Sequence, residues 1–186
     1  GPFAMKVHSK DILHKSDVGG VVLNVSDSET AETAFADIMK NAAKYCPDAR
    51  VEGVLITPML EKGMEMIIGV NNDPQFGPML MVGVFVEIFR DVAIYPAPLT
   101  RTETMKMIQS LKAYKLLDGY RGGAVYDVDA LCDMIVNIGK FAIANKNRIK
   151  ELDINPVFVY PKGEGVGIAD CLIIEYGENE EVISEH

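Results

Sequence analysis

Apolar positions along this chain follow two spacings, with segments of glycine, proline and acidic residues between them. Alternation with a period of two, or a short continuous apolar run, is typical of strands, whereas spacings of three and four predict amphipathic helices. These patterns predict strands at residues 3–7, 21–25, 51–59, 64–71, 79–82, 84–95, 149–160 and 166–174. They predict helices at about 28–45, from about 101, at 114–118 and from 127 or 129 to about 145.

Capping and turn residues refine this map. Ser26 or Ser28 is expected to cap the first helix, and Thr100 the second. The segment 60–63 reads as the turn of a hairpin, and the strands at 79–82 and 84–95 are expected to meet at Gly83. Strands and helices are mixed without strict β-α-β repetition, which predicts an α+β fold with largely antiparallel sheets.

Composition narrows the classes of protein. The chain has 186 residues and 48% hydrophobic content, enough for one substantial core or two small ones. It carries no apolar run long enough to span a membrane, and its net charge of −9 argues against nucleic acid as a main partner. Three widely spaced cysteines fit reduced thiols, so we expect a cytoplasmic protein. Residues 176–186 form an acidic tail.

The run from Leu13 to Val21 contains a candidate phosphoryl-transfer group. The imidazole of His14 could accept a phosphoryl group, Lys15 could balance its charge, and Gly19 and Gly20 allow close approach of the backbone to a phosphate. Short runs of this kind are weak evidence by themselves, and an ordinary loop histidine is the alternative.

Oxygen ligands near the other end of the chain suggest a magnesium site. Asn155 and Asp170 lie on two strands predicted to be neighbours, so they can stand close together on one face. Magnesium prefers such ligands, completed by waters and substrate phosphates. A turn asparagine and an exposed aspartate form the alternative. Glu65 either faces solvent from its strand or contacts a ribose hydroxyl.

Several runs together resemble the ATP-grasp domain of NDP-forming acyl-CoA synthetases, the family that contains ADP-forming acetate–CoA ligases. The resemblance extends from about Phe3 to Ile174. The matching runs include Ala4–Val7, Asp11–Val21, Gly53–Met59, Asp73–Pro78, Lys115–Gly122 and Glu151–Pro156.

The resemblance implies an ATP-grasp fold with two lobes and a bound nucleotide between them. It assigns residues 1–60 to a first, incomplete lobe and 61–175 to the second. Lys6 would touch phosphate, and the segment 52–57, with Glu52 and Ile56 as candidate contacts, would border adenine. Lys15, Gly19, Gly20 and Glu65 complete the candidate nucleotide-binding residues, and Asn155 and Asp170 would hold Mg²⁺.

In that family a histidine of a CoA-binding partner subunit or domain receives the phosphoryl group of an acyl phosphate. The acid and CoA are bound through this partner, and a mobile segment carries the phosphoryl group to ADP. The resemblance therefore implies a ligase that converts ADP to ATP, with His14 as a second phosphoryl carrier. Two alternatives stay open: a non-catalytic ligand-binding module of a fused acetyltransferase, and a structural fragment without a nucleotide pocket. A segment around Gly83 that is shorter than the family's glycine-rich loop favours the first of these.

Overall fold

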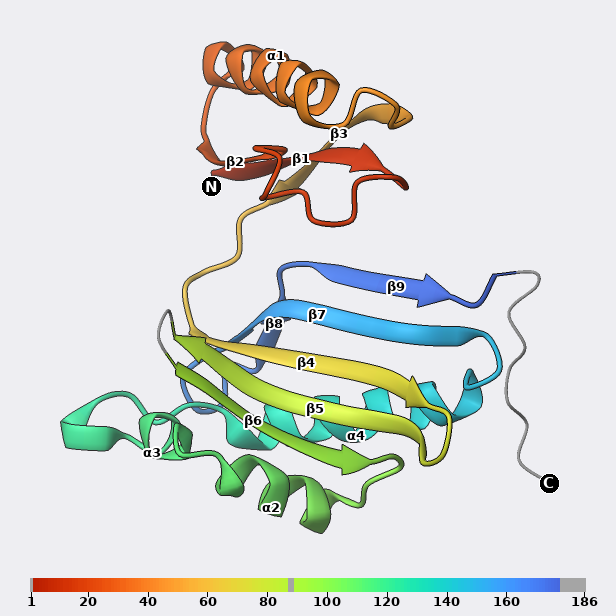
Figure 1. Cartoon of the computed structure of the whole chain (residues 1–186). Coiled ribbons are helices and arrows are strands. Elements are labelled where there is room, and N and C mark those ends of the chain that lie inside the picture. The colour runs from red at the N-terminus through yellow and green to blue at the C-terminus, as the bar shows by residue number, and fades with distance from the viewer. Residues whose placement is uncertain (1, 87–88, 178–186) are drawn as a thin grey trace. The chain divides into compact units, whose positions relative to one another are not determined.

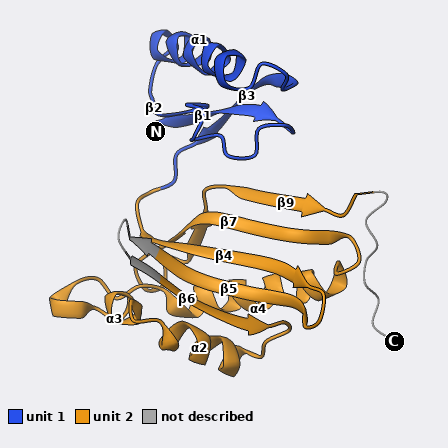
Figure 2. Ribbon diagram, in the orientation of Figure 1, with its two compact units in different colours: residues 1–60 blue, residues 61–186 orange. Residues whose placement is uncertain are grey.

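The computed structural model describes residues 2–86 and 89–177. The chain divides into two compact units, Gly1–Leu60 and Glu61–His186, which Figure 2 shows in two colours. Each unit has a hydrophobic core of its own. Most of the acidic tail, residues 178–186, lies outside the described residues.

The first unit is a three-stranded antiparallel sheet with one helix packed on it. Its elements are β1 (Phe3–Ser9), β2 (Val21–Val25), α1 (Ser28–Tyr45) and β3 (Val51–Pro58), with the strands in the order β2-β1-β3. Met5 and Val7 on the central strand are buried together with Ala34, Ile38 and Ala42 of α1. One face of the sheet is therefore covered by the helix, and the alternate residues of β1 lie on the other face (Figure 1).

The cap of α1 differs by one residue from the prediction. Asp27, rather than Ser26 or Ser28, is the N-cap, and its carboxylate accepts a hydrogen bond of 2.8 Å from the Thr30 N–H. The Thr30 hydroxyl in turn accepts from the Asp27 N–H, which completes a capping box. Three polar residues that all favour the N-cap stand side by side here, so composition could not decide between them.

The second unit is a larger antiparallel sheet with helices on one face (Figure 1). Its elements are β4 (Met64–Asp73), β5 (Gly77–Val86), β6 (Phe89–Pro96), α2 (Arg101–Ser110), α3 (Tyr114–Leu117), a short 3-10 helix (Tyr120–Gly122), α4 (Val128–Ala144), β7 (Ile149–Val159), β8 (Val166–Ile168) and β9 (Cys171–Glu175). The strand order is β6-β5-β4-β7-β8, and β9 also pairs with β7. Among the described residues, no helix is long and apolar enough to cross a membrane.

A predicted hairpin turn and a predicted break between two strands are wrong. Residues 60–63 do not close a hairpin, because β3 pairs with β1 in the first unit whereas β4 pairs with β5 and β7 in the second. Gly83 does not lie in a turn either: β5 continues through it, and Gly83 pairs with Val92 of β6. A polar or glycine-containing break between apolar runs looks the same in the sequence whether or not the runs pair with each other.

The β5–β6 pairing gives Gly83 a packing role that can be tested. A Cβ atom at this position would lie 2.6 Å from Cγ1 of Val92 and 2.8 Å from the carbonyl oxygen of Asp91. We expect Gly83→Ala to lower the free energy of unfolding by about 1–3 kcal/mol, because the backbone of β6 must shift. Urea unfolding measures this loss. Ile94→Ala, at a site 57% exposed on β6, is the control. Equal stability of Gly83→Ala and wild type would contradict the close approach.

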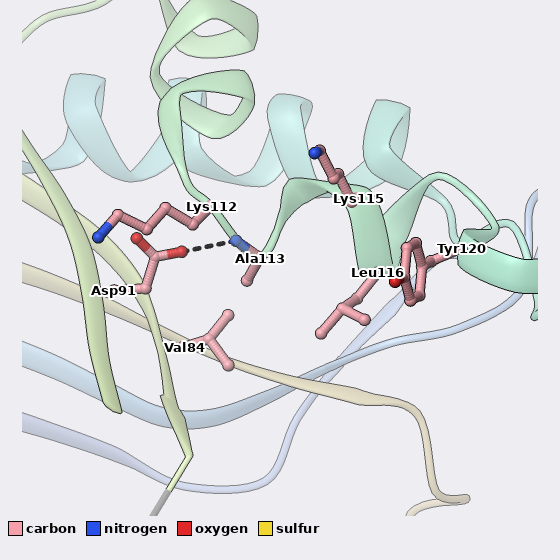
Figure 3. Close-up of a pocket in the computed structure, with 7 residues that line it drawn as sticks. All are labelled: Val84, Asp91, Lys112, Ala113, Lys115, Leu116 and Tyr120. Carbon is pink, nitrogen blue, oxygen red and sulfur yellow. Dashed lines mark hydrogen bonds between the residues drawn. The ribbon is translucent and has the colours of Figure 1, made fainter. Parts of the chain in front are cut away.

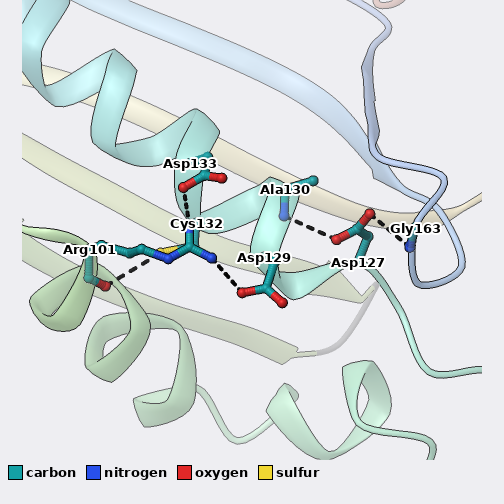
Figure 4. Close-up of polar contacts among 7 residues, drawn as sticks. All are labelled: Arg101, Asp127, Asp129, Ala130, Cys132, Asp133 and Gly163. Atoms are coloured by element: carbon teal, nitrogen blue, oxygen red, sulfur yellow. Dashed lines mark hydrogen bonds and ion pairs between the residues drawn. The ribbon is translucent and has the colours of Figure 1, made fainter.

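Polar contacts fix the two long helices of the second unit (Figure 4). Arg101 at the start of α2 forms ion pairs with Asp129 and Asp133 of α4. Asp127, one of the two predicted starts of α4, is its N-cap, and its carboxylate also accepts hydrogen bonds from the loop that follows β7. These bonds, led by the one from the Ala130 N–H, lower the pKa of the Asp127 carboxyl against the opposing effect of burial.

The lowered pKa of Asp127 predicts a pH dependence of stability. A carboxyl group whose pKa is lower in the folded state contributes stability above its unfolded pKa and loses it as the pH falls through the folded value. We expect the stability difference between wild type and Asp127→Asn to be constant from pH 7 to about 5 and to shrink below about pH 4. Urea unfolding across this pH range measures it. A difference that stays constant down to pH 3 would contradict the assignment.

Candidate functional site

The loop between β1 and β2 holds the candidate phosphoryl acceptor. Ile12 anchors this loop in the core of the first unit, with 3% of its surface exposed, whereas His14 is exposed to solvent. The Asp17 N–H donates to the His14 carbonyl at 3.3 Å, which closes a turn beside the imidazole. The arrangement therefore presents His14 at the surface on a loop whose base is fixed.

Gly19 and Gly20 shape this loop. Gly19 has a φ of +61°, and its carbonyl accepts a hydrogen bond from the Asn41 side chain of α1 at 3.1 Å. Gly20 is buried, and a Cβ atom there would lie 2.7 Å from Cγ1 of Val7. Their N–H groups donate to the carbonyls of Ser16 and Lys15, at 3.1 Å and 2.8 Å. Both amides are thus used within the loop, and contact of the two glycines with a phosphate stays a prediction.

Lys6 lies on the sheet face that α1 does not cover. It pairs with Val21 of β2 and Leu55 of β3, while its neighbours Met5 and Val7 point into the core. Because β2 begins directly after Gly20, the backbone pairing of β1 brings Lys6 next to the end of the His14 loop. A strand lysine held there can place a fixed positive charge beside a bound phosphate.

The candidate adenine-bordering residues lie on the edge strand β3. Glu52 lies beside His8 of β1, with 3.4 Å between its Oε2 atom and Nε2 of the imidazole. Ile56 is 54% exposed, although it pairs with the buried Met5. An exposed apolar side chain at a sheet edge suits contact with a flat aromatic base.

The second unit brings Asn155 and Asp170 together. The Asn155 N–H donates to the Asp170 carbonyl at 3.2 Å, and the Ala169 N–H donates to the Pro156 carbonyl at 3.0 Å. The predicted final strand divides into β8 and β9 at Ala169 and Asp170, so the break falls directly beside Asn155. This backbone pairing places an amide and a carboxylate side by side, and both are oxygen ligands of the kind that Mg²⁺ prefers. One carboxylate oxygen of Asp170 also accepts a hydrogen bond from the Cys171 N–H at 3.1 Å.

The surroundings of this pair are acidic. Burial, followed by the negative charges of Asp170 and Asp153, raises the pKa of the Cys171 thiol. Asp153 alternates with Leu152 and Ile154, which are buried against the helices, so it lies on the open face of the sheet two positions before Asn155. No cluster of three or more histidine, cysteine or acidic side chains that could hold a metal is found in the described residues. Further ligands of an ion here would be water or substrate.

Asp153 is a residue that the sequence reasoning missed. It lines a cavity of about 420 Å³ on the open face, together with Gly69, Asn71, Asp73, Met79, Met81 and Glu151, among others. The signal was the period-two spacing of Glu151, Asp153 and Asn155, which places all three on one face of β7. Glu65, by contrast, is exposed on β4 and pairs with Phe158, three residues beyond Asn155.

A second cavity, of about 340 Å³, is likewise lined by none of the predicted site residues. It lies between the β5–β6 pair and α3 and is lined by Val84, Asp91, Lys112, Ala113, Lys115, Leu116 and Tyr120 (Figure 3). The buried Asp91 carboxylate accepts a hydrogen bond of 2.7 Å from the Ala113 N–H. This bond fixes the connection between α2 and α3, so Asp91 has a structural role there.

Comparison with known proteins identifies the family. Residues 1–174 match the family model described as an ATP-grasp domain. The chain is 48% identical over 179 residues to the beta subunit of the ADP-forming acetate–CoA ligase II of Pyrococcus furiosus. That match covers 95% of this chain and 76% of the relative.

Solved structures agree with this match. The crystal structure of PH1788 from Pyrococcus horikoshii Ot3 superimposes with a TM-score of 0.90 at 45% identity, covering 96% of this chain and 76% of that one. An acetyl-coenzyme A synthetase 1 from Ca. Korarchaeum cryptofilum superimposes with a TM-score of 0.78 at 38% identity, covering 95% and 77%. That protein is in complex with coenzyme A and Mg-AMPPCP, and its phosphohistidine segment points towards the nucleotide binding site. The chain thus belongs to the ATP-grasp family and corresponds to the beta-subunit part of ADP-forming acetate–CoA ligases.

Proposed function

We propose that this chain is the nucleotide-binding part of an ADP-forming acyl-CoA synthetase that works with a CoA-binding partner subunit or domain. The overall reaction is acyl-CoA + ADP + phosphate ⇌ acid + CoA + ATP. The observation that carries the proposal is the hydrogen-bonded pairing of Asn155 with Asp170 in a chain 48% identical to a beta subunit of such a ligase. The acid and CoA are bound by the partner, which carries a phosphorylatable histidine.

His14 acts as the phosphoryl carrier on the nucleotide side. A nitrogen of the neutral imidazole attacks phosphorus, the bond from phosphorus to the donor breaks, and the other ring nitrogen keeps its proton. In the next step a terminal oxygen of ADP attacks, the P–N bond breaks, and ATP leaves with the phosphoryl group. Lys6 and Lys15 stabilise the negative charge of the transferred group, which is the main catalytic requirement of phosphoryl transfer.

Asn155 and Asp170 would hold Mg²⁺ through their side-chain oxygens. When bound, the ion neutralises phosphate charge and orients the nucleotide. The nearby carboxylate of Asp153 adds negative charge on the same sheet face, which favours a cation over an anion at this position.

The transfer step is tested by incubating the chain with [γ-³²P]ATP and Mg²⁺ and mapping the label by mass spectrometry. We expect an acid-labile phosphate on His14 that ADP removes as labelled ATP. A chain that binds Mg-nucleotide but never becomes labelled would contradict the carrier role.

A non-catalytic nucleotide-binding module is the second candidate function. It is favoured by the position of Gly83 inside β5 and by the internal hydrogen bonds of Gly19 and Gly20, which leave these amides engaged with the protein. The same labelling experiment separates the two candidates, because the module binds nucleotide without any phosphate on His14.

A further inference from the structure

We propose that Asp127, at the start of α4, is a positioning residue that holds Asp170 beside Asn155. The use of these two residues as metal ligands rests on the proposed function, whereas their placement by Asp127 rests on contacts in the second unit. Asp127 itself lies outside the ladder that joins the pair, so its action is through the turn between β7 and β8.

The carboxylate of Asp127 joins a helix to that turn (Figure 4). One oxygen accepts a hydrogen bond from the Ala130 N–H at 3.1 Å, which caps α4. The other accepts from the N–H groups of Gly163 and Gly165, both at 2.9 Å. Asp127 is 9% exposed, and its backbone N–H donates to the Tyr160 carbonyl at 2.8 Å. Asp127 therefore binds the turn at both of its ends.

The turn sets the register of β8 against β7. The Tyr160 N–H donates to the Gly165 carbonyl at 3.0 Å, and three ladder pairs follow, from Val159 with Val166 to Val157 with Ile168. The next contacts are those of Ala169 with Pro156 and Asp170 with Asn155. On the other side of Asp170, β9 continues the pairing with β7 through Cys171 and Ile154. The β8 side has a strand of only three residues to fix its register, and a slip by one residue there would turn every side chain to the opposite face.

An aspartate is needed for both tasks at once. An ionised carboxylate only accepts hydrogen bonds, so one oxygen can serve the helix and the other the two glycine N–H groups. In Asp127→Asn the amide oxygen still caps α4, because asparagine is a good N-cap. The NH₂ group, however, would face two N–H donors and could accept neither of them. This substitution separates the hold on the turn from the cap.

The experiment compares Asp127→Asn with Thr100→Ala in the full chain. Thr100 caps α2 through its own capping box with Glu103, so it controls for loss of a helix cap. Amide hydrogen exchange at Ala169 and Asn155 reports the ladder beside Asp170. The Mg²⁺ concentration at which ADP binding reaches half of its maximum reports on the proposed metal site.

In Asp127→Asn we expect hydrogen exchange at both amides to accelerate at least about tenfold. The Mg²⁺ concentration needed for half-maximal ADP binding should rise about three- to tenfold, which is the range for residues that orient metal ligands indirectly. Thr100→Ala should leave both within about twofold of wild type. Unchanged exchange in Asp127→Asn would overturn the proposal, as would faster exchange with an unchanged Mg²⁺ requirement.

A second variant and a comparison with wild type complete the experiment. Where Asp127→Asn does not fold, Asp127→Ser replaces it, because a serine caps the helix but does not reach Gly163 and Gly165. If wild type shows no Mg²⁺-dependent ADP binding, the proposed function fails. The exchange rates at Ala169 and Asn155 still decide whether Asp127 holds Asp170 in place.

Discussion

The variant His14→Ala is expected to lose all acid-labile phosphate labelling from [γ-³²P]ATP while its affinity for MgADP stays within about twofold of wild type. The reason is that, in the proposed function, the exposed imidazole is the covalent acceptor, whereas its loop is held by contacts elsewhere. Ile12 anchors the loop in the core, and Gly19 is bonded to Asn41. Scintillation counting after base quenching measures the label, and isothermal titration calorimetry measures the affinity.

His8→Ala is the matched control for this variant. His8 is also exposed, but it stands on β1 outside the loop of His14, so its loss should leave the labelling per bound nucleotide unchanged. Loss of labelling in both variants, or equal loss of labelling and nucleotide affinity in His14→Ala, would count against His14 as the carrier.

The second large effect is expected at the proposed metal pair. Asp170→Ala should raise the Mg²⁺ concentration needed for ADP binding by about 10- to 100-fold, because it removes the one charged oxygen ligand of the pair. Asp170→Asn keeps an oxygen at the same position, so the Mg²⁺ concentration that it needs should lie between those of Asp170→Ala and wild type. Magnesium titrations at fixed ADP concentration measure the shift.

Glu164→Ala controls for the change in net charge. Glu164 is an exposed residue of the turn between β7 and β8, and its removal changes the charge of the chain by the same amount. Its Mg²⁺ requirement should match that of wild type. If both variants shift the Mg²⁺ concentration needed for ADP binding equally, the effect comes from net charge rather than from a metal ligand. If Asp170→Ala does not shift it, Asp170 is not part of the metal site.

Local chemistry in the sequence predicted the elements and most of their ends. Thr100 caps its helix as expected, and Asp127 is one of the two predicted starts of α4, since the side chain that bonds the first turn lies next to the apolar periodicity of the helix. The α+β class and the ATP-grasp family are confirmed as well. The error at Asp27 arose where several capping residues are adjacent.

Long-range pairing was harder to predict. The hairpin turn expected at 60–63 and the strand break expected at Gly83 are both wrong, because pairing partners are chosen by contacts far apart in the sequence. The neighbourhood of Asn155 and Asp170 was predictable, since a short connection joins their strands. Asp127 could not be linked to them from sequence, because the link depends on where the turn of Gly163 and Gly165 packs against α4.

Thermal unfolding with and without MgADP tests the central claim most directly, with EDTA and AMP as controls. A ligand at about one hundred times its dissociation constant adds about 2.7 kcal/mol of stability, which raises the midpoint of a chain of this size by about 5–10 °C. We predict such a rise for MgADP and MgATP that EDTA removes. An unchanged midpoint at millimolar MgADP and MgATP would contradict the assignment of this chain as a nucleotide-binding part.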